Sequence, residues 1–345
     1  MLKFIQETFH SQIVLPNGES ADRAIEIRVH PITGRTCRIT YSRGEEREPG
    51  TEFLPEPPPF AAELDKCPFC CDRVGTQTPR LPTNLYREGR MIRGASTLFP
   101  NLFPYGRYSA VSLFDDQHFV EIGSASLQSY VDSFLNCRDY LLLILAHDPA
   151  AVFMAITQNH LPSAGGSLLH PHLQIQADRV PANFQRFLQR HAADYRWKYR
   201  ARLFFDYLKY EQQTGQRFIG TSGPWQWLAA FAPEGFFEIW GILPEIFSLQ
   251  QMTDQHWYYL AEGVLNTQKF YRSLGRNGYN FGLLFIEDGS DNLDLRVVLT
   301  VRSNYAPWVR SDFTGFEVML GDMATFSEPE ITAERARSFW RQSWT

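Results

Sequence analysis

Two histidines and a glutamine fall at alternate positions of one short segment, SLLHPHLQIQA at residues 167–177. Apolar and polar residues alternate from Leu173 to Ala177, which predicts a strand. Side chains of a strand alternate between its faces, so His170, His172 and Gln174 are expected on the same side. A neutral imidazole is a suitable nucleophile for a phosphorus centre, and a nearby amide can hold a phosphoryl oxygen. The segment therefore predicts covalent catalysis, with His172 as the nucleophile and Gln174 as the donor.

A second interpretation of the histidine pair is a metal-binding pair, or a chance pairing on a surface strand. The preceding residues favour a ligand site, because Gly165 and Gly166 let a backbone approach a ligand closely. Ser167 follows them with a hydroxyl group that either donates to a phosphoryl oxygen or caps a turn. The rest of the chain must decide between these interpretations.

Cys67-Pro68-Phe69-Cys70 is the second segment whose residue types and spacing indicate chemistry. Two thiolates at this spacing can bind one Zn²⁺ in a turn, but a structural zinc ion needs four ligands. A pair of buried thiols and a redox-active dithiol are the alternatives. The dithiol is disfavoured because the motif does not follow a strand and open a helix.

Together these segments resemble the galactose-1-phosphate uridylyltransferase family, a branch of the histidine-triad superfamily. The resemblance spans nearly the whole chain and is more specific in its first half. The matching segments, in chain order, are EIRVHPITGR at 26–35, CPFC at 67–70, PNLFP at 100–104, HPHLQ at 170–174 and GFE at 315–317 with Pro329, Glu330 and Ala333.

The resemblance implies an α+β, histidine-triad-like fold made of two related half-domains, each with an antiparallel sheet and helices. Residues 1–180 are expected to form the half that carries the zinc site and the His-Pro-His-x-Gln motif, and residues 181–345 the other half. The pattern of the chain is compatible with this fold, since strand-rich blocks alternate with helical periodicity at 126–148 and 254–274. Residues 1–25 are expected to form a helix or an arm, and residues 119–122 a strand.

By resemblance, His170 and His118 complete a structural zinc site with Cys67 and Cys70. Many family members hold a second metal ion through a His-x-His on a late strand. The corresponding segment here, Leu293 to Arg302, contains no histidine, so the second metal is predicted to be absent.

The resemblance also assigns six substrate contacts: Arg28, Arg43, Asn101, Asn159, Ser167 and Glu317. Some have a simpler alternative. Asn101 precedes a proline-containing corner and can instead form an Asx-turn, and each arginine can be an ordinary surface residue.

The implied activity is transfer of a nucleoside monophosphate, UMP in this family, from a nucleotide sugar to a sugar 1-phosphate through a covalent adduct on His172. A homodimer is expected, with Glu317 reaching the partner's site. The alternatives are an ADP-glucose or dinucleoside-polyphosphate phosphorylase, a nucleotide hydrolase, and a non-catalytic nucleotide- or zinc-binding protein.

Composition narrows the remaining classes. The 345-residue chain has a net charge of −5, which predicts no nucleic-acid partner. It has no apolar run of the roughly 20 residues that span a membrane, and no signal-peptide core at its start. Five cysteines, three of them clustered at 67, 70 and 71, do not indicate a disulfide framework and predict a reducing cytoplasm.

Overall fold

The computed structural model describes residues 2–40, 59–63, 66–70, 73–302 and 312–341. Arg43 lies outside these ranges. Within the described ranges, no helix has the length and apolar character that a membrane crossing requires.

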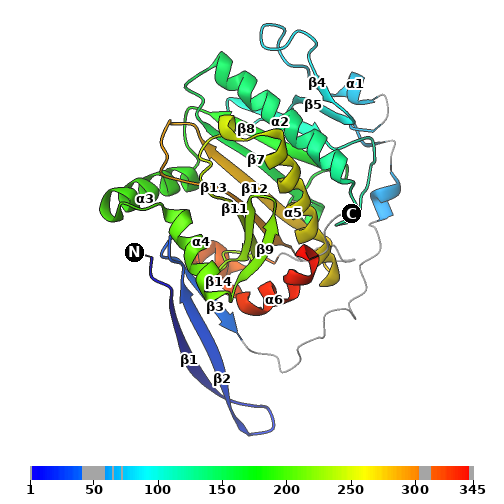
Figure 1. The fold of residues 1–345 in the computed structure, drawn as a ribbon. Helices are drawn as coiled ribbons and strands as arrows, with labels where there is room; N and C mark the ends of the chain where they lie inside the picture. The colour runs from blue at the N-terminus through cyan, green and yellow to red at the C-terminus, as the bar shows by residue number, and fades with distance from the viewer. Residues whose placement is uncertain (1, 41–58, 64–65, 71–72, 303–311, 342–345) are drawn as a thin grey trace.

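A ten-stranded sheet forms the centre of the molecule, and every neighbouring pair of its strands is antiparallel (Figure 1). In spatial order its strands are β4 (Met91–Arg93), β5 (Ser96–Pro100), β6 (Tyr108–Leu113), β8 (His172–Asp178), β7 (Phe153–His160), β12 (Tyr279–Ile286), β13 (Leu295–Val301), β11 (Phe236–Leu243), β10 (Trp225–Ala229) and β9 (Phe218–Ser222). The helices are α1 (Arg73–Gln77), α2 (Leu127–His147), α3 (Asn183–Tyr199), α4 (Leu203–Thr214), α5 (Asp254–Ser273) and α6 (Pro329–Trp340).

The sheet contains the same succession of elements twice. Three strands, a long helix and two strands occur as β4-β5-β6-α2-β7-β8 and again as β9-β10-β11-α5-β12-β13. Across the sheet, the strands of the second set follow in the reverse order of their counterparts in the first. The two sets join edge to edge where β7 pairs with β12. The predicted α+β fold with two related antiparallel halves is thus confirmed, although the halves share one continuous sheet. The boundary at residue 180 stays a prediction.

Helices α2 and α5 cover one face of this sheet, and their apolar faces form the main core with it (Figure 1). Helix α2 begins where the Ser126 hydroxyl accepts a hydrogen bond from the backbone amide of Ser129 at 3.0 Å, a typical N-cap. Residues Leu173, Ile175 and Ala177 of β8 are fully buried in this core. The alternate residues of β8 therefore point to the opposite face of the sheet.

A smaller four-stranded sheet contains β1 (Ile5–Val14), β2 (Ser20–Val29), β3 (Thr36–Thr40) and β14 (Met323–Thr325). Strands β1 and β2 form a hairpin that projects from the body (Figure 1), and every residue of β1 is exposed. The arm expected for residues 1–25 is therefore a β-ribbon and not a helix. Apolar residues four apart, as at Ile5, Phe9 and Ile13, fit either period. The turn at Gly18, with φ of +86°, is what commits the segment to a hairpin.

Candidate active site and metal centre

His172 and Gln174 lie side by side on the face of the sheet that α2 and α5 leave uncovered, because they alternate with the core residues of β8. Gln174 pairs across the sheet with Val111 of β6 and with Thr157 of β7. Its side chain forms no hydrogen bond with any described residue and is only partly buried. An unengaged amide therefore stands next to the imidazole of His172.

The orientation of the His172 ring is set by its own backbone neighbourhood. Its Nδ1–H donates to the carbonyl oxygen of His170 at 2.7 Å, which leaves Nε2 with a free lone pair. Burial lowers the pKa of His172, and the hydrogen bond to His170 only partly opposes this effect. The ring of Phe69 packs edge-on against the imidazole, with centroids 5.5 Å apart. The arrangement presents a neutral imidazole whose Nε2 carries a free lone pair.

Cys67, Cys70, His118 and His170 form a compact cluster, and one ligand atom from each lies within 4.8 Å of the others. Cys70 Sγ is 3.1 Å from His118 Nδ1 and 3.4 Å from His170 Nδ1. Tetrahedral zinc with thiolate and imidazole ligands needs ligand–ligand separations of roughly 3.5–3.8 Å, so the donors are close to that geometry. The predicted set of four is confirmed as a cluster that could hold a metal ion.

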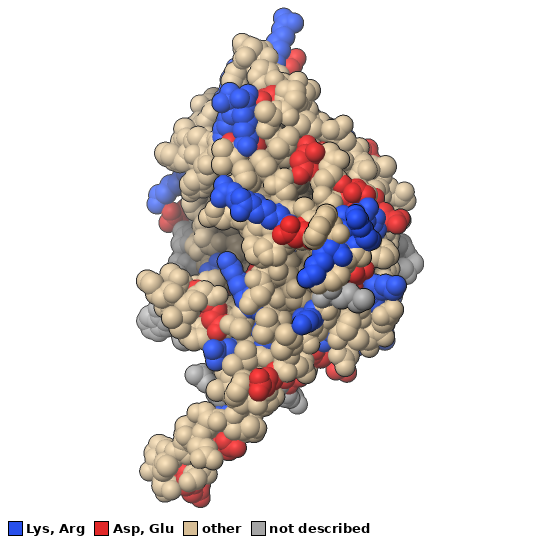
Figure 2. Space-filling view, turned by 90° about the vertical axis from the view of Figure 1, so that its left-hand side faces the viewer, with Lys and Arg blue, Asp and Glu red and all other residues tan. Residues whose placement is uncertain are grey.

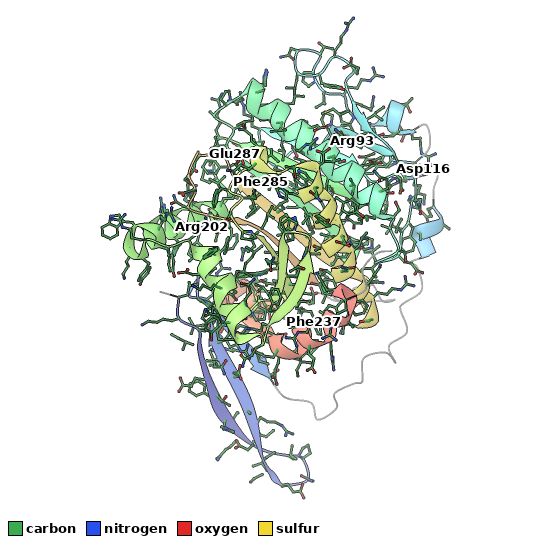
Figure 3. The ribbon with its side chains drawn as sticks, viewed as in Figure 1. Arg93, Asp116, Arg202, Phe237, Phe285 and Glu287 are labelled. Carbon is green, nitrogen blue, oxygen red and sulfur yellow. The ribbon has the colours of Figure 1, made fainter. Side chains whose placement is uncertain are left out.

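The second nitrogen of His170 supports this assignment of the ring. His170 Nε2–H donates to the backbone carbonyl of Asp115 at 2.9 Å, which leaves Nδ1 for a metal. Burial lowers the pKa of His170 to about 4, so the ring is neutral at pH 7. The loop from Asp115 to Ile122 carries His118 and contains no strand, contrary to the strand expected at 119–122. In Figure 3 the labelled Asp116 marks this loop, on the same flank as Arg93 of β4.

The cluster of Cys67, Cys70, His118 and His170 is directly connected to His172. The His170 carbonyl that orients His172 belongs to a cluster residue, and Phe69 of the Cys67–Cys70 turn contacts both imidazole rings, at 5.5 and 6.0 Å. A metal ion that holds Cys67, Cys70 and His170 together would therefore also hold the ring of His172.

A chain of polar side chains leads away from the site across the junction of the two halves. Arg302 donates to Asn280 Oδ1 at 2.9 Å, and Asn280 Nδ2 donates to Asn159 Oδ1 at 2.7 Å and to the carbonyl of Ala164 at 2.9 Å. Arg302 is itself held by a bidentate ion pair with Asp312 at 2.7–3.0 Å. Because arginine can only donate, it determines the orientation of both amides.

Asn159 consequently has its amide oxygen engaged and its Nδ2 available as a donor. It lies two residues beyond Thr157, which pairs with Gln174, so it sits in the register next to His172. Two amide donors, on β7 and β8, thus flank the imidazole. Such donors suit the oxygens of a phosphoryl group under attack.

The glycine-rich loop between β7 and β8 packs tightly against the end of β7. A Cβ atom at Gly166 would lie 2.8 Å from the Asn159 carbonyl oxygen and 3.0 Å from that of Leu161. Only glycine fits this approach. Ser167 follows it as an exposed residue that forms no hydrogen bond within the described ranges.

Three other residues expected to bind substrate already have partners inside the chain. Arg28 is buried and ion-paired with Glu26 and Glu330. The Asn101 side chain accepts from the Phe103 amide at 3.1 Å, which is the Asx-turn alternative. Glu317 accepts from the backbone and hydroxyl of Thr314 at the start of its own π-helical turn, Phe316–Leu320. Their roles in substrate binding stay predictions.

Sequence reasoning missed Phe69, Asn280 and Arg302 as parts of the site. In the sequence, Phe69 is one of the two residues between Cys67 and Cys70, and the motif assigns it no function of its own. A bulky aromatic residue at this position is nevertheless well placed to pack against nearby ligand side chains. Asn280 and Arg302 belong to the second half, far from any motif. Nothing in their own sequence context signals that β7 and β12 are neighbours.

No family model matches the sequence. A protein of Archaeoglobus fulgidus, described only as uncharacterized, is 27% identical over 342 residues, which cover 95% of this chain and 96% of that protein. An ADP-glucose phosphorylase from Arabidopsis thaliana, solved with bound ADP-glucose, is similar in structure with a TM-score of 0.69 and 18% identity, over 91% of this chain and 98% of that one. A uridylyltransferase structure is similar with a TM-score of 0.65 and 19% identity, over 92% of this chain and 99% of that one. The chain therefore has the fold of these proteins, as its motifs predicted.

Proposed function

We propose that the protein is a nucleotidyltransferase that transfers a nucleoside monophosphate from a nucleotide sugar through a covalent adduct on His172. The observation that carries the proposal is the hydrogen bond from His172 Nδ1–H to the His170 carbonyl, which leaves Nε2 as a nucleophile beside two amide donors. The fold shared with an ADP-glucose phosphorylase and a uridylyltransferase supports the same chemistry.

In the first step, His172 Nε2 attacks the α-phosphorus of the donor and forms a phosphorus–nitrogen bond. The bond from that phosphorus to the bridging oxygen breaks, and the sugar 1-phosphate leaves with the electron pair. In the second step, a phosphate oxygen of the acceptor attacks the same phosphorus and releases the imidazole. Gln174 and the Asn159 amide donate to the phosphoryl oxygens, where negative charge increases in each transition state.

The identity of the acceptor and the identity of the nucleobase are the more specific parts of this proposal. A sugar 1-phosphate acceptor with UMP transfer is the activity implied by the sequence motifs, and inorganic phosphate with an ADP-sugar is the alternative. Ser167, Asn101 and Glu317 are retained as proposed substrate contacts. Arg28 is retained with them, although its guanidinium is paired with Glu26 and Glu330 in the buried interior.

We further propose that the Cys67, Cys70, His118 and His170 cluster binds zinc as a structural ion. Two thiolates and two neutral imidazoles are the ligand set that zinc prefers, and four protein ligands leave no open position for water. The role of the ion is to hold the turn at Phe69 and the backbone of His170, which together orient His172.

The test is adduct formation in the absence of an acceptor. Incubation with UDP-glucose or ADP-glucose, followed by intact-mass measurement, should show one added nucleoside monophosphate that is labile in acid and stable in base. His172→Asn should abolish the adduct, while His147→Asn, the same change at an exposed histidine at the end of α2, should leave it intact. Gln174→Ala should slow adduct formation by roughly 10²-fold.

An adduct that persists in His172→Asn would refute the nucleophile assignment. Adduct release on addition of galactose 1-phosphate, compared with release by inorganic phosphate, distinguishes a transferase from a phosphorylase. Steady release with neither acceptor present would identify a hydrolase.

A homodimer with shared sites is the last part of the proposal. The segment around Glu317 exposes Val318, Met319 and Leu320, at 65%, 81% and 70% of their surfaces, which is unusual for three consecutive apolar side chains. Burial against a second copy would account for this exposure. Mixing His172→Asn chains with Glu317→Ala chains should then restore part of the activity, and a monomer by light scattering at micromolar concentration would contradict the proposal.

A further inference from the structure

A cavity of about 300 Å³ opens in the second half of the molecule, on the face of the sheet opposite α2 and α5. Its floor is formed by β11, β12 and β13, and helices α3 and α4 form its wall. In Figure 3 this end is marked by Arg202 and Glu287, on the opposite flank from Asp116 of the metal-centre loop. The space-filling view of this side of the molecule shows acidic and basic side chains interspersed over its surface (Figure 2). Much of the lining is apolar, with Phe184, Leu188, Phe204, Leu284 and Val298.

This cavity is the counterpart of the His172 site within the repeated succession of elements. Strand β13 is the last strand of the second set, as β8 is of the first, and each lies beside the strand at the central junction. Leu295, Val297 and Leu299 of β13 point into the main core. Arg296 alternates with them and so occupies the face that His172 and Gln174 occupy on β8.

Arg296 is a buried cation for which the described part of the chain offers no hydrogen-bond or ion-pair partner. Its side chain is 8% exposed, and its guanidinium lies over the rings of Trp240 at 4.1 Å and Phe204 at 4.8 Å. Among the residues that the structure describes, it forms no hydrogen bond and no ion pair. Guanidinium groups have five N–H donors, and burying them without acceptors is unfavourable. The donors can be satisfied only from the cavity that Arg296 lines.

The carboxylates near Arg296 are engaged elsewhere. Glu238 accepts from the Trp240 indole and from the backbone amide of Glu234, and Glu234 accepts from the Thr33 hydroxyl. Elsewhere in the lining, Asp288 accepts from Gln189. The buried Asp294 accepts from the backbone amide of Glu245 through one oxygen, and its other oxygen has no hydrogen-bond partner among the described residues. None of them forms an ion pair with Arg296, yet together they make the surroundings unfavourable for a ligand with two negative charges.

We propose that this cavity binds a small organic molecule with a single carboxylate and an apolar body. The planar guanidinium group of Arg296 can donate two parallel hydrogen bonds to a carboxylate, and stacking on Trp240 holds the guanidinium in place. The phenylalanine and leucine side chains of the wall contact the apolar body. A phosphate monoester, with more charge, is disfavoured by Glu238 and Asp288.

Calorimetric titration of the whole protein with 3-phenylpropionate and octanoate tests the proposal. At least one acid should bind with a dissociation constant below about 1 mM. 3-Phenylpropanamide, of the same shape but uncharged, and phenyl phosphate should each bind at least tenfold more weakly. Arg296→Met should abolish acid binding, and Glu238→Gln, which removes the neighbouring negative charge, should tighten it. The absence of binding by both acids, or equal binding of acid and amide, would overturn the proposal.

Two further measurements separate this site from folding and from nucleotidyl transfer. Because Arg296 has no hydrogen-bond or ion-pair partner among the described residues, Arg296→Met should keep or raise the thermal midpoint. A lowered midpoint together with lost binding would show that Arg296 is a structural cation and overturn the proposal. His172→Asn should bind the acids as the unmodified protein does. This result holds whether or not His172 forms an adduct, so the two proposals can fail independently.

Discussion

Replacing Glu330 by Gln should destabilise the fold more than any other single charge removal on α6. Glu330 accepts a bidentate pair from Arg28 at 2.8 and 3.0 Å and a further hydrogen bond from Arg217 at 2.6 Å. Both guanidinium groups lie 5.0 Å from the centroid of the Phe231 ring. The carboxylate therefore joins the last helix to β2 and to the residue that precedes β9 through two buried cations.

The size of the effect follows from what remains after the change. Breaking a buried ion pair costs about 3–5 kcal/mol, because a charge is left uncompensated. Here Arg28 keeps Glu26 and Arg217 keeps Glu211, and the Glu330 side chain is 27% exposed. We therefore expect a loss of about 2–3 kcal/mol in the free energy of unfolding. The control Glu334→Gln, at an exposed position of the same helix, should change it by less than about 0.5 kcal/mol.

Urea unfolding followed by fluorescence measures both variants, and the pH dependence adds a second check. Burial would raise the pKa of Glu330, but its hydrogen bonds with Arg28 and Arg217 bring the pKa below its ordinary value. Its contribution is thus present above the ordinary pKa of glutamate and is lost as pH falls through the lowered value in the fold. The difference between Glu330→Gln and the unmodified protein should shrink in acid. Equal stabilities of Glu330→Gln and Glu334→Gln at pH 7 would refute the reasoning.

Three shorter predictions concern the metal, the packing and a second buried acid. Cys67→Ser should reduce the zinc content from about one ion per chain and lower the thermal midpoint, as measured by metal analysis and calorimetry, because metal binding is coupled to folding. Gly263→Ala should cost about 1–3 kcal/mol in urea unfolding, since its Cβ would lie 2.0 Å from the Trp227 ring, whereas Gly282→Ala, with open space, should be near neutral. Burial raises the pKa of Glu238 to about 7, so the free energy of unfolding should fall as pH rises from about 4.5 to 7. Glu238→Gln should remove about 2–4 kcal/mol of this pH-dependent loss. An unchanged pH dependence of the free energy of unfolding would contradict this account.

The local parts of the site could be predicted from the sequence. Alternation along Leu173–Ala177 places His172 and Gln174 on one face, and the Cys67–Cys70 spacing with His118 and His170 describes the metal cluster. These features depend on residue spacing within a strand or a turn, or on motifs that the resemblance supplied.

The remaining parts depend on contacts between distant segments. Arg28 looked like a nucleotide contact because it stands in a matching motif, but its partner Glu330 lies 302 residues away. Asn280 and Arg302 join the site only because β12 pairs with β7. Arg296 was visible as a polar residue in an apolar strand, yet only the packing of α3 and α4 shows that its guanidinium is buried beside a cavity.

The pairing of β7 with β12 also has a consequence for the ancestry and the engineering of the chain. Eight residues of each strand pair across this seam, from Phe153 with Ile286 to His160 with Tyr279. Either set of elements alone would expose that row of backbone groups as an open edge, which recruits another strand or aggregates. The simplest precursor is therefore a single-set protein that associated with a second copy of itself along this edge. A chain divided between α3 and α4 should, for the same reason, yield two fragments that reassemble with each other along this edge.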